Sequence, residues 1–108
     1  MPTDWNARKM EAFDRALELF KGGKPFVDDL RTAARCELEA YRSSGFVEAV
    51  RVIAAGDSCP ACRAMNGQIL PLEEALASSP LPVHGCTHKM GRRTGWCRCT
   101  FVAVVPDP

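Results

Sequence analysis

Five of the six cysteines lie between positions 59 and 99 of this 108-residue chain, and Cys36 stands apart from them. A chain of this length forms one domain with a modest hydrophobic core, so a cross-link between distant segments would add substantially to its stability. The sequence predicts neither a signal peptide nor a membrane span. We therefore expect a cytoplasmic protein, in which reduced, clustered thiols bind metal more often than they form disulfides.

The first 45 residues have the periodicity of two helices joined by a short linker. Thr3 or Asp4 can cap the first helix, and Gly22 ends it. Its apolar residues recur at spacings of three and four, namely Met10, Phe13, Leu17 and Phe20. The second helix begins near Pro25, and its apolar stripe consists of Phe26, Leu30, Ala34, Leu38 and Tyr41. We predict an antiparallel helical hairpin over residues 1–45, whose aromatic residues belong to the core.

Two segments rich in β-branched residues, 46–54 and 100–105, predict strands. The first is apolar on both faces, which is typical of a strand covered on two sides. Between them we expect a short helix over 72–77 and a tight hairpin at Asn66-Gly67, a dipeptide that accepts two positive φ angles. The predicted fold class is α+β: two N-terminal helices pack on a small antiparallel sheet. Residues 1–108 then form a single domain, with the hairpin in 1–45 and a cysteine-rich β module in 46–106.

The cysteines flank the two predicted strands. The pair Cys59 and Cys62 follows the first strand, and the pair Cys97 and Cys99 directly precedes the last. If these strands pair, the four sulfurs converge at one end of the sheet, where each could lie about 2.3 Å from a tetrahedral Zn²⁺ ion. The sequence therefore predicts a structural zinc site, with a closed coordination sphere and no catalytic residue.

The fourth ligand stays open, because three further candidates lie nearby: His84, Cys86 and His88. Of these, Cys86 is the first reserve. A second ion would need all seven candidate ligands, so we expect one. Disulfides are an alternative, and a buried apolar thiol is the interpretation that suits Cys36.

Redox chemistry is a weaker alternative. Cys59-Pro60-Ala61-Cys62 resembles the active turn of thiol oxidoreductases, in which a helix stabilises the first thiolate. Here Gly67 interrupts any helix after five residues, so we expect that stabilising helix to be missing.

The order of these motifs resembles the C-terminal module of phage Mu F-like head morphogenesis proteins. The matching features are Cys59-Pro60-Ala61-Cys62, Asn66-Gly67, and Cys97-Arg98-Cys99-Thr100 before an apolar strand that ends at Pro106. The resemblance covers about residues 46–106. At positions 94–96 the chain has Thr94-Gly95-Trp96 where the family has His-Pro-Asn. The resemblance implies a metal-stabilised module that binds a phage head or portal component, and a virion-associated location; it transfers no catalytic residue.

A local basic region supports a different alternative, a small zinc-containing nucleic-acid-binding module. Lys89, Arg92 and Arg93 could contact phosphates, with Trp96 as a stacking surface. A solvated loop that keeps the cluster soluble explains the same charges, because these basic residues are fewer than a nucleic-acid-binding surface usually carries.

Overall fold

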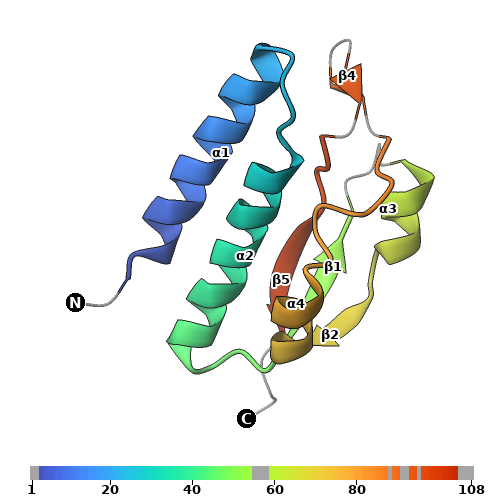
Figure 1. Ribbon diagram of the computed structural model, residues 1–108. Helices are drawn as coiled ribbons and strands as arrows, with labels where there is room; N and C mark the ends of the chain where they lie inside the picture. The colour runs from blue at the N-terminus through green and yellow to red at the C-terminus, as the bar shows by residue number, and fades with distance from the viewer. Residues whose placement is uncertain (1–2, 55–58, 88, 91–92, 95, 105–108) are drawn as a thin grey trace.

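Two long helices lie side by side at one edge of the molecule, and a small sheet with two short helices forms the rest (Figure 1). The computed structural model describes residues 3–54, 59–87, 89–90, 93–94 and 96–104. In chain order the elements are α1 (Trp5–Lys21), α2 (Val27–Ser44), β1 (Ala49–Ile53), α3 (Pro60–Met65), β2 (Ile69–Pro71), α4 (Leu72–Ser78), β3 (Lys89–Met90), β4 (Arg93–Thr94) and β5 (Thr100–Val104). The predicted α+β class is confirmed.

The two long helices form separate layers. Helix α2 contacts both β5 and α4, and α1 packs on α2 (Figure 1). At the start of α1, the side chain of Asp4 accepts a hydrogen bond of 3.0 Å from the backbone N–H of Ala7, which confirms one of the two predicted caps. At the end of α2, Gly45 adopts a φ of +77°, a conformation that glycine tolerates better than any other residue. No helix in the described part of the chain has the length and apolarity that crossing a membrane requires.

The contact between α1 and α2 rests on small residues. Ala12 and Ala16 are fully buried, whereas Met10, which we expected in the core, is 57% exposed. Alanines four residues apart share one face of a helix and let the partner helix approach closely. The prediction that Met10 belongs to the buried stripe is therefore wrong. A spacing of three or four residues also fits a position at the border of the buried face.

Helix α2 connects the hairpin to the sheet. Leu38 is buried with Phe101 of β5 in one core cluster. The hydroxyl of Tyr41 donates to the Glu37 carboxylate at 3.0 Å and lies 3.4 Å from the carbonyl oxygen of Phe101. The stripe predicted for α2 thus faces both the sheet and α1.

The sheet is antiparallel, in the order β2-β1-β5. Val50, Val52 and Phe101 are buried on the face toward the helices. The other face carries Ile53 and Val102, which are 36% and 42% exposed. The expectation that the first strand is covered on two sides is wrong among the described residues: only one face is covered.

The dipeptide Asn66-Gly67 forms a turn between α3 and β2. Asn66 has φ −59° and ψ 130°, Gly67 has φ +85°, and the N–H of Gln68 donates to the carbonyl of Met65 at 3.1 Å. These values indicate a type II turn, in which only the second central residue needs a positive φ. The predicted hairpin is wrong because a helix, not a strand, precedes the turn. The predicted helix over 72–77 is confirmed as α4.

Candidate metal centre

The first two cysteines lie at the start of α3. Cys59 is the residue before the helix, Pro60 occupies the first turn, and Cys62 is 1% exposed. We expected the helix after this motif to be missing, and that expectation is wrong. Pro60 has a φ that suits a helix start, and six residues fit before the turn at Asn66.

The last two cysteines arrive with β5. Ile53, the final residue of β1, pairs with Thr100, the first residue of β5. This register brings the segment before β5 to the end of the sheet at which β1 leaves. The sulfur atoms of Cys62 and Cys97 lie 3.8 Å apart, so the two predicted cysteine pairs do meet.

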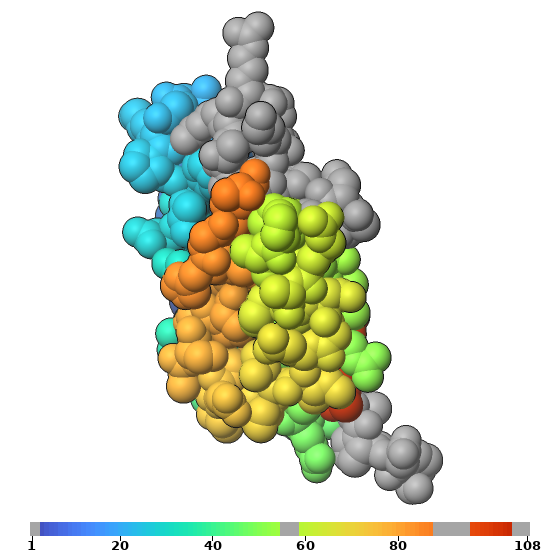
Figure 2. All heavy atoms as spheres, turned by 90° about the vertical axis from the view of Figure 1, so that its right-hand side faces the viewer, coloured from blue at the N-terminus to red at the C-terminus, as the bar shows by residue number. Residues whose placement is uncertain are grey.

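A fifth cysteine, Cys86, enters from the loop that follows α4. That loop lies alongside α3 on the face seen in Figure 2. The sulfur of Cys86 is 3.4 Å from the sulfur of Cys62 and 3.8 Å from the sulfur of Cys59. The sulfur of the reserve ligand Cys86 thus lies closer to the Cys62 sulfur than that of the predicted ligand Cys97, which is 3.8 Å away.

Backbone N–H groups of the same loop point at two of the sulfurs. Val83 donates to the sulfur of Cys97 and Thr87 to that of Cys59, each at 3.4 Å. Such hydrogen bonds stabilise negative charge on sulfur, as metal ligation requires. The sequence analysis missed these donors, although both lie within three residues of Cys86.

The five sulfurs form two compact groups that share one member. Cys59, Cys62 and Cys86 form the first group and Cys62, Cys97 and Cys99 the second; within each, all sulfurs lie within 4.8 Å of one another. Four sulfurs that each lie about 2.3 Å from a zinc ion are about 3.8 Å from one another. The Cys59–Cys86 and Cys62–Cys97 separations of 3.8 Å match that spacing and the Cys62–Cys86 separation of 3.4 Å is slightly shorter, so the cysteines could hold a metal ion.

The thiols differ strongly in acidity. Burial opposes ionisation of Cys59, but hydrogen bonds from the backbone of Thr87 and Cys62 and from neighbouring thiols lower its pKa to about 6. Burial raises the pKa of Cys62 far above its usual range, and hydrogen bonding with its neighbours adds to the rise. Burial also raises the pKa of Cys99 to about 11. A cation bound among the sulfurs would stabilise the thiolate form of each cysteine. It would thereby offset the effect of burial, which opposes loss of the thiol protons.

All six cysteines are free thiols, so the disulfide alternative finds no support. Cys36 is buried in α2, in neither sulfur group, as expected for a small apolar residue. Within the described chain both sulfur groups consist of cysteines alone, and His84 is exposed. His88 lies outside the described residues.

Three of the four residues predicted for nucleic-acid contact lie among the described residues. The backbone of Lys89 and Arg93 forms the antiparallel pair β3 and β4, and Arg92 lies outside the described residues. Trp96 is half-buried, and its ring centroid is 5.3 Å from that of Phe20 and 5.4 Å from that of Phe26. Packing against the hairpin accounts for Trp96 without a nucleic-acid base.

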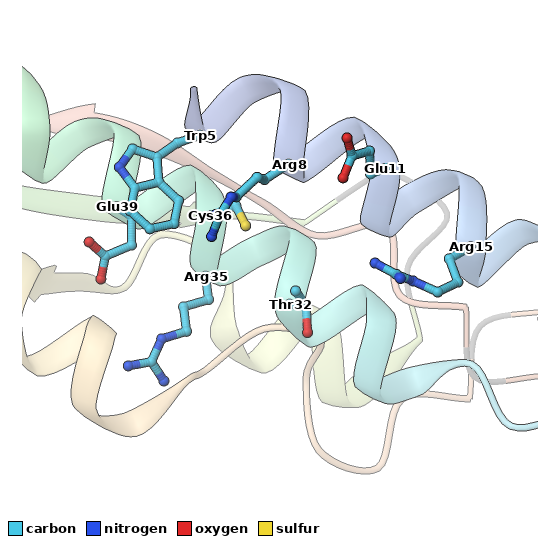
Figure 3. A pocket seen from close by; sticks show the side chains of 8 residues that line it. All are labelled: Trp5, Arg8, Glu11, Arg15, Thr32, Arg35, Cys36 and Glu39. Carbon is cyan, nitrogen blue, oxygen red and sulfur yellow. The ribbon is translucent and has the colours of Figure 1, made fainter. Parts of the chain in front are cut away.

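A separate groove of about 460 Å³ lies between α1 and α2 (Figure 3). Its walls carry three arginines, and the Arg8 guanidinium lies 5.5 Å from the centre of the Trp5 ring. Arg15 also pairs with Asp29 at 3.1 Å. No sequence motif marks this groove, because its side chains come singly from the outward faces of two helices.

Comparisons of the chain with protein-family models, with curated proteins and with solved structures find no significant match. The geometry of the cysteine cluster is therefore the basis for a functional conclusion.

Proposed function

We propose that this chain is a structural or protein-interaction module whose cysteine cluster holds Zn²⁺. The observation that carries the proposal is the placement of Cys62, whose buried sulfur lies 3.4 Å from that of Cys86 and 3.8 Å from that of Cys97. Those two partners come from segments well separated from α3 in the sequence. A thiophilic ion bound here cross-links all three segments.

The chemistry of the donors supports zinc. Thiolate is a soft ligand, and sites made of cysteine alone are typical of structural zinc or of iron–sulfur clusters. Zinc supplies positive charge and a tetrahedral cross-link without redox chemistry. The predicted ligands are Cys59, Cys62, Cys97 and Cys99, and the short distances to Cys86 support its inclusion in the cluster.

The module needs such a cross-link because its other sources of stability are small. β1 and β5 have five residues each, β2 has three, and one face of the sheet is uncovered among the described residues. Structural zinc binds cysteine-rich peptides with about 10–16 kcal/mol at neutral pH, and this free energy becomes folding free energy. That amount is comparable with the whole stability of a small domain, about 5–15 kcal/mol.

Elemental analysis combined with thiol counting tests the proposal. Reduced, folded protein should contain zinc, and the cluster cysteines should react with a thiol reagent only after a chelator is added. A Cys36→Ala variant is the matched control, because Cys36 belongs to neither sulfur group; its zinc content should equal that of the unaltered protein. Folded, reduced protein that contains no metal would refute the proposal.

We further propose that the module belongs to phage or prophage head assembly, where it binds a head or portal component. The ordered motifs of residues 46–106 support this, as does the uncovered sheet face with Ile53, Ile69 and Val102, since exposed apolar patches commonly mark protein contacts. Products of neighbouring genes should include phage structural proteins, and one of them should co-purify with this chain. Neighbours without any phage structural protein would contradict this part of the proposal.

A further inference from the structure

The cluster contains more sulfurs than one ion can use. A tetrahedral zinc ion takes four thiolates, and the structure brings five together. They form two groups of three with Cys62 in common, and no four of the sulfurs all lie within 4.8 Å of one another. Two adjacent sites that share one ligand describe this pattern better than a single site with a spare thiol.

From this arrangement we infer that the centre is binuclear: two divalent, thiophilic ions are bridged by the thiolate of Cys62. One ion is bound by Cys59, Cys62 and Cys86, and the other by Cys62, Cys97 and Cys99. The inference rests on the proposed structural zinc centre and adds its stoichiometry. Two separate sites would need all seven candidate ligands. Two sites that share the sulfur of Cys62 need only the five cysteines.

The position of Cys62 suits a bridging ligand. It is the most buried of the five cysteines, at 1% exposure, and it makes the sulfur contacts to Cys86 and Cys97 that join the two groups. A bridging thiolate binds its two ions through two different lone pairs of one sulfur. It must therefore lie between the ions rather than at the edge of the cluster.

Charge favours two ions as well. Cys59, Cys62 and Cys97 belong to the main hydrophobic core, with Leu38, Val52 and Phe101 among its members. Negative charge in such surroundings is costly unless it is compensated. One divalent ion with four thiolates, the fifth cysteine staying a neutral thiol, carries a formal charge of −2, whereas two divalent ions with five thiolates carry a formal charge of −1.

Three sulfurs leave each ion one further coordination position. Cys97 and Cys99 line a cavity of about 300 Å³ that also borders Lys9, Glu37 and Trp96. Water or another small ligand can reach the second ion through this cavity. The second group therefore does not need a fourth protein ligand.

Native mass spectrometry of the full reduced chain, titrated with Zn²⁺ and then with Cd²⁺, tests the inference. We expect two ions per chain, and cadmium NMR should show two resonances that are coupled through the shared sulfur. Cys86→Ser and Cys99→Ser each disrupt one group, so each should reduce the stoichiometry from two ions to one. Cys36→Ser should still bind two ions.

Each other outcome has a distinct meaning. One ion in the unaltered chain, with one outer cysteine replaceable without loss of that ion, would overturn the binuclear centre and leave the proposed zinc module intact. No bound ion in folded, reduced protein would overturn both. A second ion that persists in both Cys86→Ser and Cys99→Ser would place it outside the cysteines and also overturn the inference.

Discussion

The sulfur atoms of Cys62 and Cys86 lie 3.4 Å apart, although one residue belongs to α3 and the other to the loop beyond α4. The contact joins two segments that backbone hydrogen bonds of the sheet do not join. Cys62 belongs to the main core cluster and Cys86 packs against it. Two sulfur atoms this close together can bind the same cation. The stability of residues 46–104 should therefore depend on metal.

Replacement of Cys62 should be far more damaging than replacement of Cys36. Both are buried cysteines in helices, but only Cys62 belongs to the sulfur groups. We expect Cys62→Ala to lose bound metal and the structure of the C-terminal half, because the loss of zinc-binding free energy is of the order of 10 kcal/mol. Cys36→Ala should keep the metal and lose about 1–2 kcal/mol of unfolding free energy. Equal metal content in the two variants would contradict the proposed site.

Fluorescence of Trp96 should report metal removal. Trp96 packs on Phe20 and Phe26 and directly precedes Cys97. In a Trp5→Phe background Trp96 is the single tryptophan. Chelation should shift its emission to longer wavelength as the segment leaves the aromatic cluster, and added Zn²⁺ should reverse the shift. Emission that does not change on complete metal removal would show that Trp96 is held independently of the cysteines.

Tyr41 should titrate late. Burial, and secondarily the Glu37 carboxylate, raise the pKa of Tyr41 from 10.0 to about 12. Because the folded value is higher than the unfolded one, the stabilisation is complete below pH 10 and is lost as the pH rises toward about 12. Absorbance of the single tyrosine in metal-loaded protein measures the pKa directly.

The matched variant is Tyr41→Phe. It removes the hydrogen bonds to Glu37 and Phe101, and the unfolding free energy should fall by about 1 kcal/mol at neutral pH. Between pH 10 and 12 its stability should depend less on pH than that of the parent. A tyrosine midpoint near pH 10 in folded protein would contradict the partial burial of this hydroxyl.

The hairpin interface should resist enlargement of its alanines. Ala16 is fully buried beside Phe26 and Leu30, so Ala16→Leu should cost about 1–3 kcal/mol of unfolding free energy. Met10→Leu changes an exposed position and should alter stability by less than about 0.5 kcal/mol. Denaturant unfolding of both variants checks this; a larger loss for Met10→Leu would restore the core that the helical periodicity predicted.

Periodicity and capping residues predicted the hairpin well. Asp4 as a cap and the stripe of α2 follow from local chemistry, and both are present. Ala12 and Ala16 could not be distinguished in advance, because alanine contributes little to an apolar pattern yet permits the closest helix contact. Helix α3 was missed because six residues are too few to show a helical period.

Sequence spacing predicted the meeting of Cys62 with Cys97, since strand pairing fixes where a chain leaves and re-enters a sheet. It ranked Cys86 only as the first reserve ligand, because the path of the loop after α4 depends on packing against α3 rather than on a local pattern. Apolar residues on both faces of β1 likewise do not reveal which face this chain covers.

The most direct test of the structural metal centre is the two-dimensional amide NMR spectrum of reduced protein before and after chelation. On metal removal, we expect the dispersed signals of β1 and β5 to collapse to unfolded positions while helical signals of α1 and α2 persist. Zinc should then restore the original spectrum. A spectrum that stays fully dispersed after complete metal removal would contradict a metal centre that holds this half of the molecule together.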